Sequence, residues 1–358
     1  MRLAYIEKDR LIYAVRGAGL TERSTVRQKH GLVPRPGRWR GHCSFPATGA
    51  SWTIRSPAPL SAPLRRGVAE LVASFERTWS RFRPDSLVSR AARGEFGAGP
   101  ALLDLPPGSG RILDLYDRLH TASSGRIDPL VGARLVELGY DPAYSFTVRH
   151  GNLRRLDAPA ETMNWAASAH HDGDLLRLET PALVDVGAVG KGALADLVSD
   201  LLDGSGVTEH IVDASGDVVV RSAEPVRIGL EEPGAEDRVV GVVELTEGAV
   251  CASGISHRAW GNGLHHILDA LTGQPTSSVL ASWTVARRGA EADGLATALF
   301  MTPPQDLVAA GFRFDFVLLR SDGTAAMSRT FPRLGEVFTR EAPHPPARPP
   351  AGPGERAL

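Results

Sequence analysis

The chain has 358 residues, is 42% hydrophobic, and carries 40 basic against 41 acidic side chains. This balance gives no global charge that would indicate binding to nucleic acid, and the apolar runs are shorter than the roughly 18 residues that span a bilayer. We therefore expect no transmembrane segment and, without a secretion signal, a cytoplasmic protein. Cys43 and Cys251 are the only cysteines, too few for a disulfide framework or a cysteine-based structural zinc site.

Three regions differ in composition. Residues 1–43 are rich in arginine and punctuated by proline and glycine, which predicts a basic, poorly ordered arm. Residues 340–358 are dominated by proline, alanine and glycine and predict a disordered tail. Between them, residues 44–339 are expected to form a single large domain.

Within that domain, the predicted strands and helices do not alternate regularly along the chain. Apolar residues at helical spacing, such as Val68, Val72 and Phe75, predict a helix over 62–82. Further helices are predicted over 111–123, 130–138, 192–202 and 290–301, a loop over 86–99, and strands over 50–55, 183–186, 210–214, 218–220, 227–230, 239–245, 281–286, 314–319 and 324–327. This irregular order favours an α+β fold with mixed, largely antiparallel sheets over a doubly wound one.

Asp293 and Thr297 lie four residues apart in the predicted helix 290–301, so their side chains share one face. A carboxylate and a hydroxyl are oxygen ligands of the kind that Mg²⁺ prefers. The alternative is that Asp293 only stabilises the start of its helix, where negative charge is favoured, and that the Thr297 hydroxyl bonds its own backbone.

A glycine turn joins a short apolar segment to the predicted helix 192–202. It runs from Asp185 through Val-Gly-Ala-Val-Gly to Lys191, and it matches neither a Walker A loop nor the GxGxxG spacing. N–H groups at such a helix start suit a phosphate, and Lys191 is one of only three lysines in the chain. A simple turn with a solvated lysine is the alternative reading.

A histidine pair, His265 and His266, precedes Ile267 and a turn. An imidazole can take a proton from a hydroxyl nucleophile near neutral pH. A surface histidine pair without a catalytic role would have the same sequence.

Placed together in this order, these segments resemble the ApbE family, the Mg²⁺-dependent FAD:protein FMN transferases. The family's flavin-contacting methionine is absent, since Thr48, Gly49 and Ala50 stand in that segment, and Ala270 replaces a proline. The matching segments are 80–86, 125–129, 185–192, 215–217, 252–254, 266–273 and 292–298, within a span of about 45–334.

The resemblance implies a T-fold-related single domain and assigns roles to residues. Asp293 and Thr297, with the backbone carbonyl of Ala188, would hold Mg²⁺. His266 would deprotonate the acceptor hydroxyl. His266 and Asp293 are the two expected catalytic residues. The residues expected to contact FAD are Thr48, Arg126, Ile127, Asp128, Asp185, Lys191, His266 and Ile267.

The implied reaction moves FMN from FAD to a serine or threonine of an acceptor protein with an FMN-binding domain, and AMP leaves. Two alternatives stay open from the sequence: an FAD diphosphatase that uses water as the acceptor, and an FAD-binding protein without turnover. We expect no nucleic-acid partner. We expect the protein to be a monomer or a homodimer.

Overall fold

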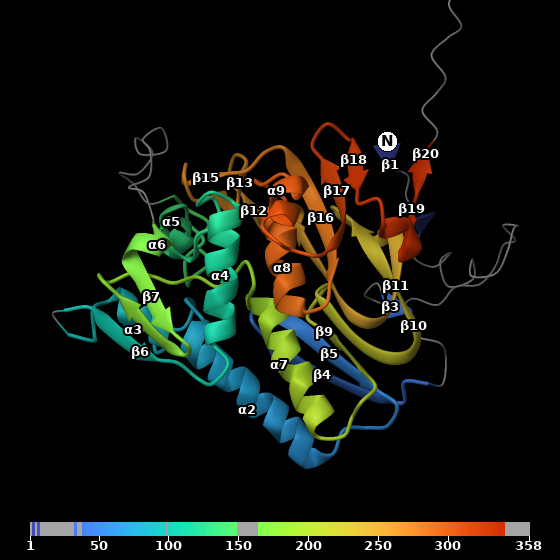
Figure 1. Cartoon of the computed structure of the whole chain (residues 1–358), viewed down its shortest axis with the longest axis horizontal. Helices are drawn as coiled ribbons and strands as arrows, with labels where there is room; N and C mark the ends of the chain where they lie inside the picture. The colour runs from blue at the N-terminus through green and yellow to red at the C-terminus, as the bar shows by residue number, and fades with distance from the viewer. Residues whose placement is uncertain are drawn as a thin grey trace, which may run out of the picture.

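An antiparallel sheet runs through the middle of the molecule (Figure 1). The computed structural model describes residues 2–3, 6–7, 32–33, 38–97, 99–148 and 164–340. The strands of this sheet are β2 Ile6–Glu7, β3 Leu32–Val33, β4 Gly41–Ala47, β5 Ala50–Ser56, β9 His210–Asp213, β10 Val218–Glu232, β11 Ala235–Gly254, β16 Val279–Ala286, β17 Asp315–Arg320, β18 Ala325–Met327 and β19 Gly335–Val337. Their order is β18-β17-β16-β11-β10-β9-β5-β4, with β2 and β19 paired to β11 and β3 paired to β10.

Both faces of the central strands of this sheet are buried. Alternate residues of a strand point to opposite faces, and in β10 Val219 packs in the core under the helices while Val218 and Val220 pack in a second core on the other face. That second core is closed by Phe331 and Leu334 near the end of the described chain. Valine-rich strands fit this two-sided burial.

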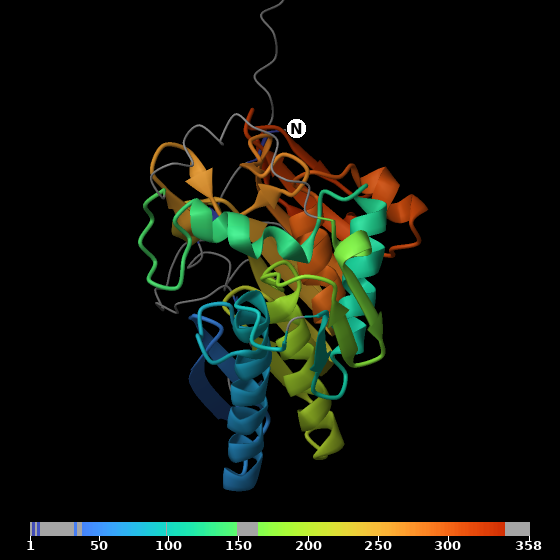
Figure 2. The same cartoon turned by 90° about the vertical axis from the view of Figure 1, so that its left-hand side faces the viewer.

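Helices cover one face of the sheet, and smaller sheets lie beside them. In Figure 2, α2 and α7 lie side by side. The helices are α2 Ala62–Trp79, α3 Leu87–Ala92, α4 Gly110–Ala122, α5 Gly132–Glu137, α6 Trp165–Ser168, α7 Gly190–Gly204, α8 Gly289–Ala298 and α9 Pro304–Ala309, with 3₁₀ turns η1 Pro129–Val131, η3 Ser256–Arg258 and η4 Phe331–Arg333. The remaining strands are β1 Arg2–Leu3 with β20 Thr339–Arg340, β6 Ala101–Asp104 with β8 Leu175–Leu178 and β7 Ala169–Asp172, β12 Ala259–Trp260 with β13 Leu264–His265, and β14 Leu268–Asp269 with β15 Gln274–Pro275.

Helix α2 shows how local sequence sets an element. Ser61 caps it by accepting a hydrogen bond from the Leu64 N–H, and Pro63 stands in its first turn, where no N–H partner is lost. Its buried residues include Val68, Val72 and Phe75, the apolar face that the sequence predicted.

The starts of α7 and α8 touch each other through glycines. A Cβ atom at Gly192 would collide with the carbonyl oxygen of Gly289, and a Cβ at Gly289 would lie 2.7 Å from the Gly192 oxygen. Asp196 of α7 accepts the N–H groups of Gly289 and Ala290 at 2.8 and 3.0 Å, which caps α8 from its neighbour. This packing fixes the two helix starts relative to each other.

The α+β class, the antiparallel sheet and the main helices confirm the prediction. Two local predictions are wrong. Residues 183–186 form no strand, because the Asp185 N–H bonds the Pro129 carbonyl at 2.7 Å instead of a neighbouring strand. The predicted loop 86–99 contains α3, capped by the Ser86 side chain. The predicted tail from residue 341 onward and most of the predicted basic arm lie outside the described residues, so these region boundaries stay predictions.

Candidate active site

A group of charges with two buried carboxylates and a partly exposed ammonium joins α7, α8 and the turn before β10. The Lys191 ammonium contacts the Asp217 carboxylate, whose Oδ1 also accepts the Ala252 N–H at 3.1 Å. Asp293 on α8 is 2% exposed, and its Oδ2 accepts the Gly192 N–H at 3.0 Å. We call Lys191, Asp217 and Asp293 the charge cluster.

The charge cluster has one ammonium for two carboxylates. Burial and the neighbouring charge of Asp217 raise the pKa of Asp293 to about 7, although Lys191 opposes this rise. Burial alone would lower the pKa of Lys191, but the carboxylates of Asp217 and Asp293 raise it above its usual value. Lys191 therefore stays charged, and Asp293 lacks a full positive partner.

The predicted metal ligands lie near this deficit of positive charge. Thr297 follows Asp293 by one turn of α8, and its hydroxyl lies 3.2 Å from the Ser253 hydroxyl. Ala188 is half-buried in the glycine turn before α7. No cluster of three or more histidine, cysteine, aspartate or glutamate side chains suited to a metal occurs in the described ranges, so a cation here would depend on mixed oxygen ligands.

Asp185 is held in place on both of its oxygens. Oδ2 accepts the Arg81 Nε–H at 2.6 Å, and Oδ1 accepts the Gly187 N–H at 2.6 Å. The Tyr116 hydroxyl donates to the Asp185 carbonyl oxygen at 3.1 Å. Asp185 thus shapes the glycine turn that leads to Ala188 and Lys191.

His266 directly follows β13 and lies close enough to Lys191 for that charge to act on it. Burial, with the positive charges of Arg258 and Lys191 and the neighbouring His265, lowers the pKa of His266 to about 3. Its ring faces the Tyr140 ring at 6.3 Å, edge to face. Its Nδ1 is buried without a hydrogen-bond partner in the portion of the chain that is described. The next residue, Ile267, is buried, with its N–H 3.3 Å from His265 Nδ1.

The predicted segment Arg126–Asp128 divides into exposed and buried parts. Arg126 is half-buried and pairs with Asp269. Ile127 is buried, and its N–H bonds the Ser123 hydroxyl at 2.9 Å. The Asp128 oxygens accept the N–H groups of Leu130 and Trp165, both at 2.8 Å. Asp128 is thus occupied by backbone groups, and its flavin contact stays a prediction.

Thr48 lies in the turn between β4 and β5 with a φ of 50°. Its N–H bonds the Glu76 carboxylate at 2.8 Å, and its hydroxyl accepts the Trp52 indole N–H at 3.3 Å. A Cβ atom at the following Gly49 would lie 3.5 Å from the Tyr144 hydroxyl, so this turn reaches the aromatic side chains near Tyr140.

Two residues of this region were not among the predicted site residues. Asp217 follows Ser215 and Gly216, whose φ values of 62° and 105° form the tight turn before β10. The sequence signal was present, because an acidic residue directly after such a turn faces the neighbouring strands. Arg81 lies in the matching segment 80–86, but nothing local to it indicates its partner, because Asp185 lies far away in the sequence.

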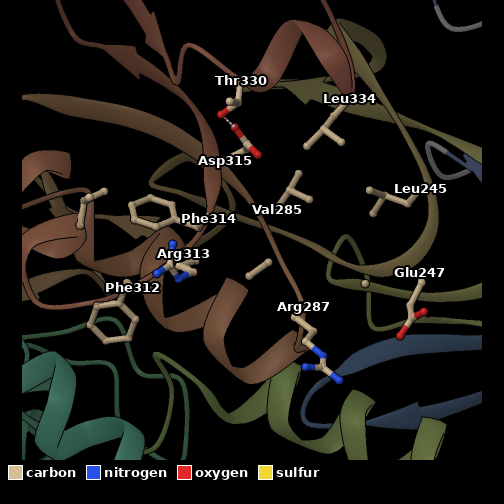
Figure 3. A pocket seen from close by; sticks show the side chains of 13 residues that line it. Leu245, Glu247, Val285, Arg287, Phe312, Arg313, Phe314, Asp315, Thr330 and Leu334 are labelled. Atoms are coloured by element: carbon tan, nitrogen blue, oxygen red, sulfur yellow. Dashed lines mark hydrogen bonds between the residues drawn. The ribbon is translucent and has the colours of Figure 1, made fainter.

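A separate open hollow of about 840 Å³ lies at the ends of β16 and β17 (Figure 3). Apolar side chains such as Val285 and Phe312 line it, with Arg287 and Arg313. The Asp315 carboxylate in its wall already accepts hydrogen bonds from Ser328 and Thr330. None of the predicted site residues lines this hollow.

Curated proteins with similar sequences share one name. The protein called FAD:protein FMN transferase from Rhodobacter capsulatus is 30% identical over 74% of this chain, which spans 51% of that relative's length. Proteins of the same name from Klebsiella pneumoniae and Treponema pallidum are 32% and 28% identical, and the matches cover 72% and 73% of their lengths.

Solved structures show the same fold. The flavin transferase ApbE from Vibrio cholerae has a TM-score of 0.70 at 23% identity, and the match covers 82% of this chain and 98% of that one. The ApbE protein from Thermotoga maritima has the same TM-score and coverage at 21% identity. No helix in the described part of this chain is long and apolar enough to cross a bilayer. Residues 48–311 match the sequence profile of the ApbE family, and the chain is therefore a member of that family.

Proposed function

We propose that this protein transfers FMN from FAD to a serine or threonine hydroxyl of an acceptor protein with an FMN-binding domain. The hydroxyl oxygen bonds to the flavin-side phosphorus, the bond from that phosphorus to the bridging oxygen breaks, and AMP leaves with the bridging oxygen. The observation that carries the proposal is the charge cluster beside a neutral His266. Membership of the ApbE family and the name shared by its curated relatives support the same reaction.

Asp293, Thr297 and the Ala188 carbonyl are proposed to hold Mg²⁺. The donor set consists of hard oxygens, which suit this ion, and the raised pKa of Asp293 reflects a buried carboxylate short of positive charge. When bound, Mg²⁺ neutralises negative charge on the diphosphate of FAD. The residues therefore fit the ion, although Asp293 and Thr297 are the only side-chain ligands in this set.

The start of α7 is the proposed diphosphate site. Its N–H groups follow the glycine turn, and such groups favour negative charge. Lys191 adds a charge that stays positive at neutral pH. The other proposed contacts to FAD are Thr48, Arg126, Ile127, Asp128, Asp185 and Ile267.

His266 is the proposed general base. At neutral pH its imidazole is uncharged, because its pKa is about 3, so it is able to accept the proton of the acceptor hydroxyl. The same low pKa makes it a weak base. Negative charge on bound FAD would raise that pKa, which would couple proton acceptance to the presence of the substrate.

A cytoplasmic enzyme acting as a monomer or homodimer is part of the proposal, and no nucleic acid takes part in it.

The test mixes purified protein, FAD, Mg²⁺ and an acceptor with an FMN-binding domain, and then measures flavin fluorescence on the denatured acceptor and released AMP. Labelled acceptor and AMP, both lost with a chelator, support the transferase. AMP and free FMN without labelled acceptor would instead identify the diphosphatase. Bound FAD without either product would identify a flavin-binding protein without turnover.

A further inference from the structure

Arg81 is a buried cation whose partners come from two distant segments. It lies just after α2 and is 5% exposed. Its Nε donates to Asp185 Oδ2 at 2.6 Å, and its Nη1 donates to the Tyr140 carbonyl oxygen at 2.7 Å. A buried guanidinium needs such partners, because its hydration shell is lost.

One end of this arrangement is the glycine turn. Asp185 bonds Arg81 with one oxygen and the Gly187 N–H with the other, so the guanidinium orients the carboxylate that closes the turn. The turn then leads through Ala188 to the start of α7 at Gly190. Movement of Asp185 would displace the carbonyl of Ala188, the proposed metal ligand.

The other end is the aromatic group around Tyr140. The Arg81 guanidinium lies 4.1 Å from the centre of the Phe82 ring and 4.5 Å from that of Tyr140. Tyr140 in turn faces His266 at 6.3 Å between ring centres. A flat guanidinium suits both the ring contacts and the two hydrogen bonds, which a lysine cannot reproduce together.

We propose that Arg81 is a positioning residue for FMN transfer: its guanidinium fixes the Asp185–Gly190 turn relative to Tyr140, and so sets the position of the Ala188 carbonyl relative to His266, which packs on Tyr140. This inference rests on the proposed function. Arg81 acts through Asp185 and Tyr140, and we assign it no contact with the reacting atoms. Its Nη2 is buried without a hydrogen-bond partner among the residues that the structure describes, so Asp185 is its only anionic contact there.

The test measures FAD binding by fluorescence at increasing Mg²⁺ concentration, in the full-length protein and its Arg81→Lys and Arg81→Met variants. Loss of a group that orients a metal ligand typically costs about 10–100-fold in metal affinity. We expect Arg81→Met to raise the half-maximal Mg²⁺ concentration by that factor and Arg81→Lys by less, with kcat recovering at saturating Mg²⁺. Because Arg81→Lys keeps the positive charge, it still provides a test if Arg81→Met does not fold.

Arg83→Met and Arg83→Lys are the matched controls, because Arg83 pairs with Asp85 on the surface two residues away. Unchanged Mg²⁺ dependence in folded Arg81 variants would overturn the inference, even if their stability is lower. If the wild-type protein binds FAD with Mg²⁺ but transfers nothing, the proposed transfer reaction is wrong. The same titrations would still decide the role of Arg81 in Mg²⁺-dependent FAD binding. If FAD binding by the wild-type protein does not depend on Mg²⁺, both the proposed function and the role of Arg81 are wrong.

Discussion

Asp185 and Asp293 are both buried aspartates next to glycine-rich helix starts, but their partners differ. Asp185 has a guanidinium of its own, Arg81, and an N–H group from Gly187. Asp293 has the Gly192 N–H and shares the Lys191 ammonium with Asp217. The first carboxylate is balanced within the protein, and the second is not.

Buried aspartates can thus serve two purposes in a single site. A buried charge with a dedicated partner holds structure, because moving it would leave both ions unpaired. A buried charge with a shared partner favours an added cation, because that cation relieves the repulsion between two carboxylates. Asp185 therefore belongs to the framework of the proposed site, and Asp293 to its chemistry.

Asp293→Asn should reduce activity more than any other variant proposed for this site. The amide keeps the size and the acceptor for the Gly192 N–H but removes the charge, so Mg²⁺-dependent AMP release should fall by more than about 100-fold, beyond the usual cost of changing a group behind a metal ligand. Steady-state assays across a range of Mg²⁺ concentrations measure this. Asp306→Asn, at an exposed position on α9, is the control. Full Mg²⁺-dependent activity in Asp293→Asn would mean that Asp293 does not hold the metal and so does not differ from Asp185 in this respect.

Lys191→Met should destabilise the folded protein by about 3 kcal/mol, the typical cost of leaving a buried charge without its partner. Asp217 is 1% exposed, and among the residues that the structure describes its carboxylate would retain only the Ala252 N–H. Urea unfolding at pH 7 without Mg²⁺ measures the change. Adding Asp217→Asn to the same protein should restore most of the loss, and a double variant as unstable as Lys191→Met alone would mean that the unpaired Asp217 charge is not its cause.

Acid should weaken the fold through His266. Its folded pKa of about 3 lies below its ordinary value of 6.5, so the unfolded chain binds the proton first. Stability is therefore present above pH 6.5 and is lost as the pH falls from 6.5 toward 3, by roughly 2 kcal/mol at pH 5. Urea midpoints at pH 7.5 and pH 5 should differ more in the wild type than in His266→Gln. The exposed His42→Gln serves as the control, and equal pH dependence in all three would contradict the burial of His266.

The smallest effect is expected from Tyr116→Phe, which removes one hydrogen bond to the Asp185 carbonyl oxygen. The free energy of unfolding should fall by about 1 kcal/mol, the usual net value of such a bond. The change acts on the glycine turn alone, so the affinity for Mg²⁺ should shift less than in Arg81→Met. A larger shift would make Tyr116 the main support of the turn.

Local patterns in the sequence predicted much of the fold. Helical spacing of apolar residues placed α2, α4, α7 and α8 within a few residues, and the strand signals of β5, β9 and β16 were correct in type. The extent of β10 and β11 was underestimated, because their pairing with each other extends order beyond the apolar core of each strand. Residues 183–186 look like a strand because three of the four are apolar, but the Asp185 N–H bonds the Pro129 carbonyl and not a neighbouring strand.

The candidate site was predictable where its parts share a helix or a turn, as Asp293 does with Thr297. The Arg81–Asp185 pair was not, because no periodicity links two residues on separate segments that meet only in the folded chain. Asp128 shows the opposite case: a matching motif singled it out, and its oxygens bind backbone N–H groups of Leu130 and Trp165. Motif order located the region, and tertiary contacts decide which groups in it are free to act.

The contact between the Gly192 amide and Asp293 also provides a spectroscopic reporter. The Gly192 N–H donates directly to Asp293 Oδ2. The chemical shift of this amide should therefore follow the charge of the Asp293 carboxylate and its ligation by a metal. The neighbouring Gly289 holds the amide in place without a side chain. A single glycine resonance in a nitrogen–proton correlation spectrum would therefore track occupation of the proposed metal site directly, without substrate, acceptor or any mutation.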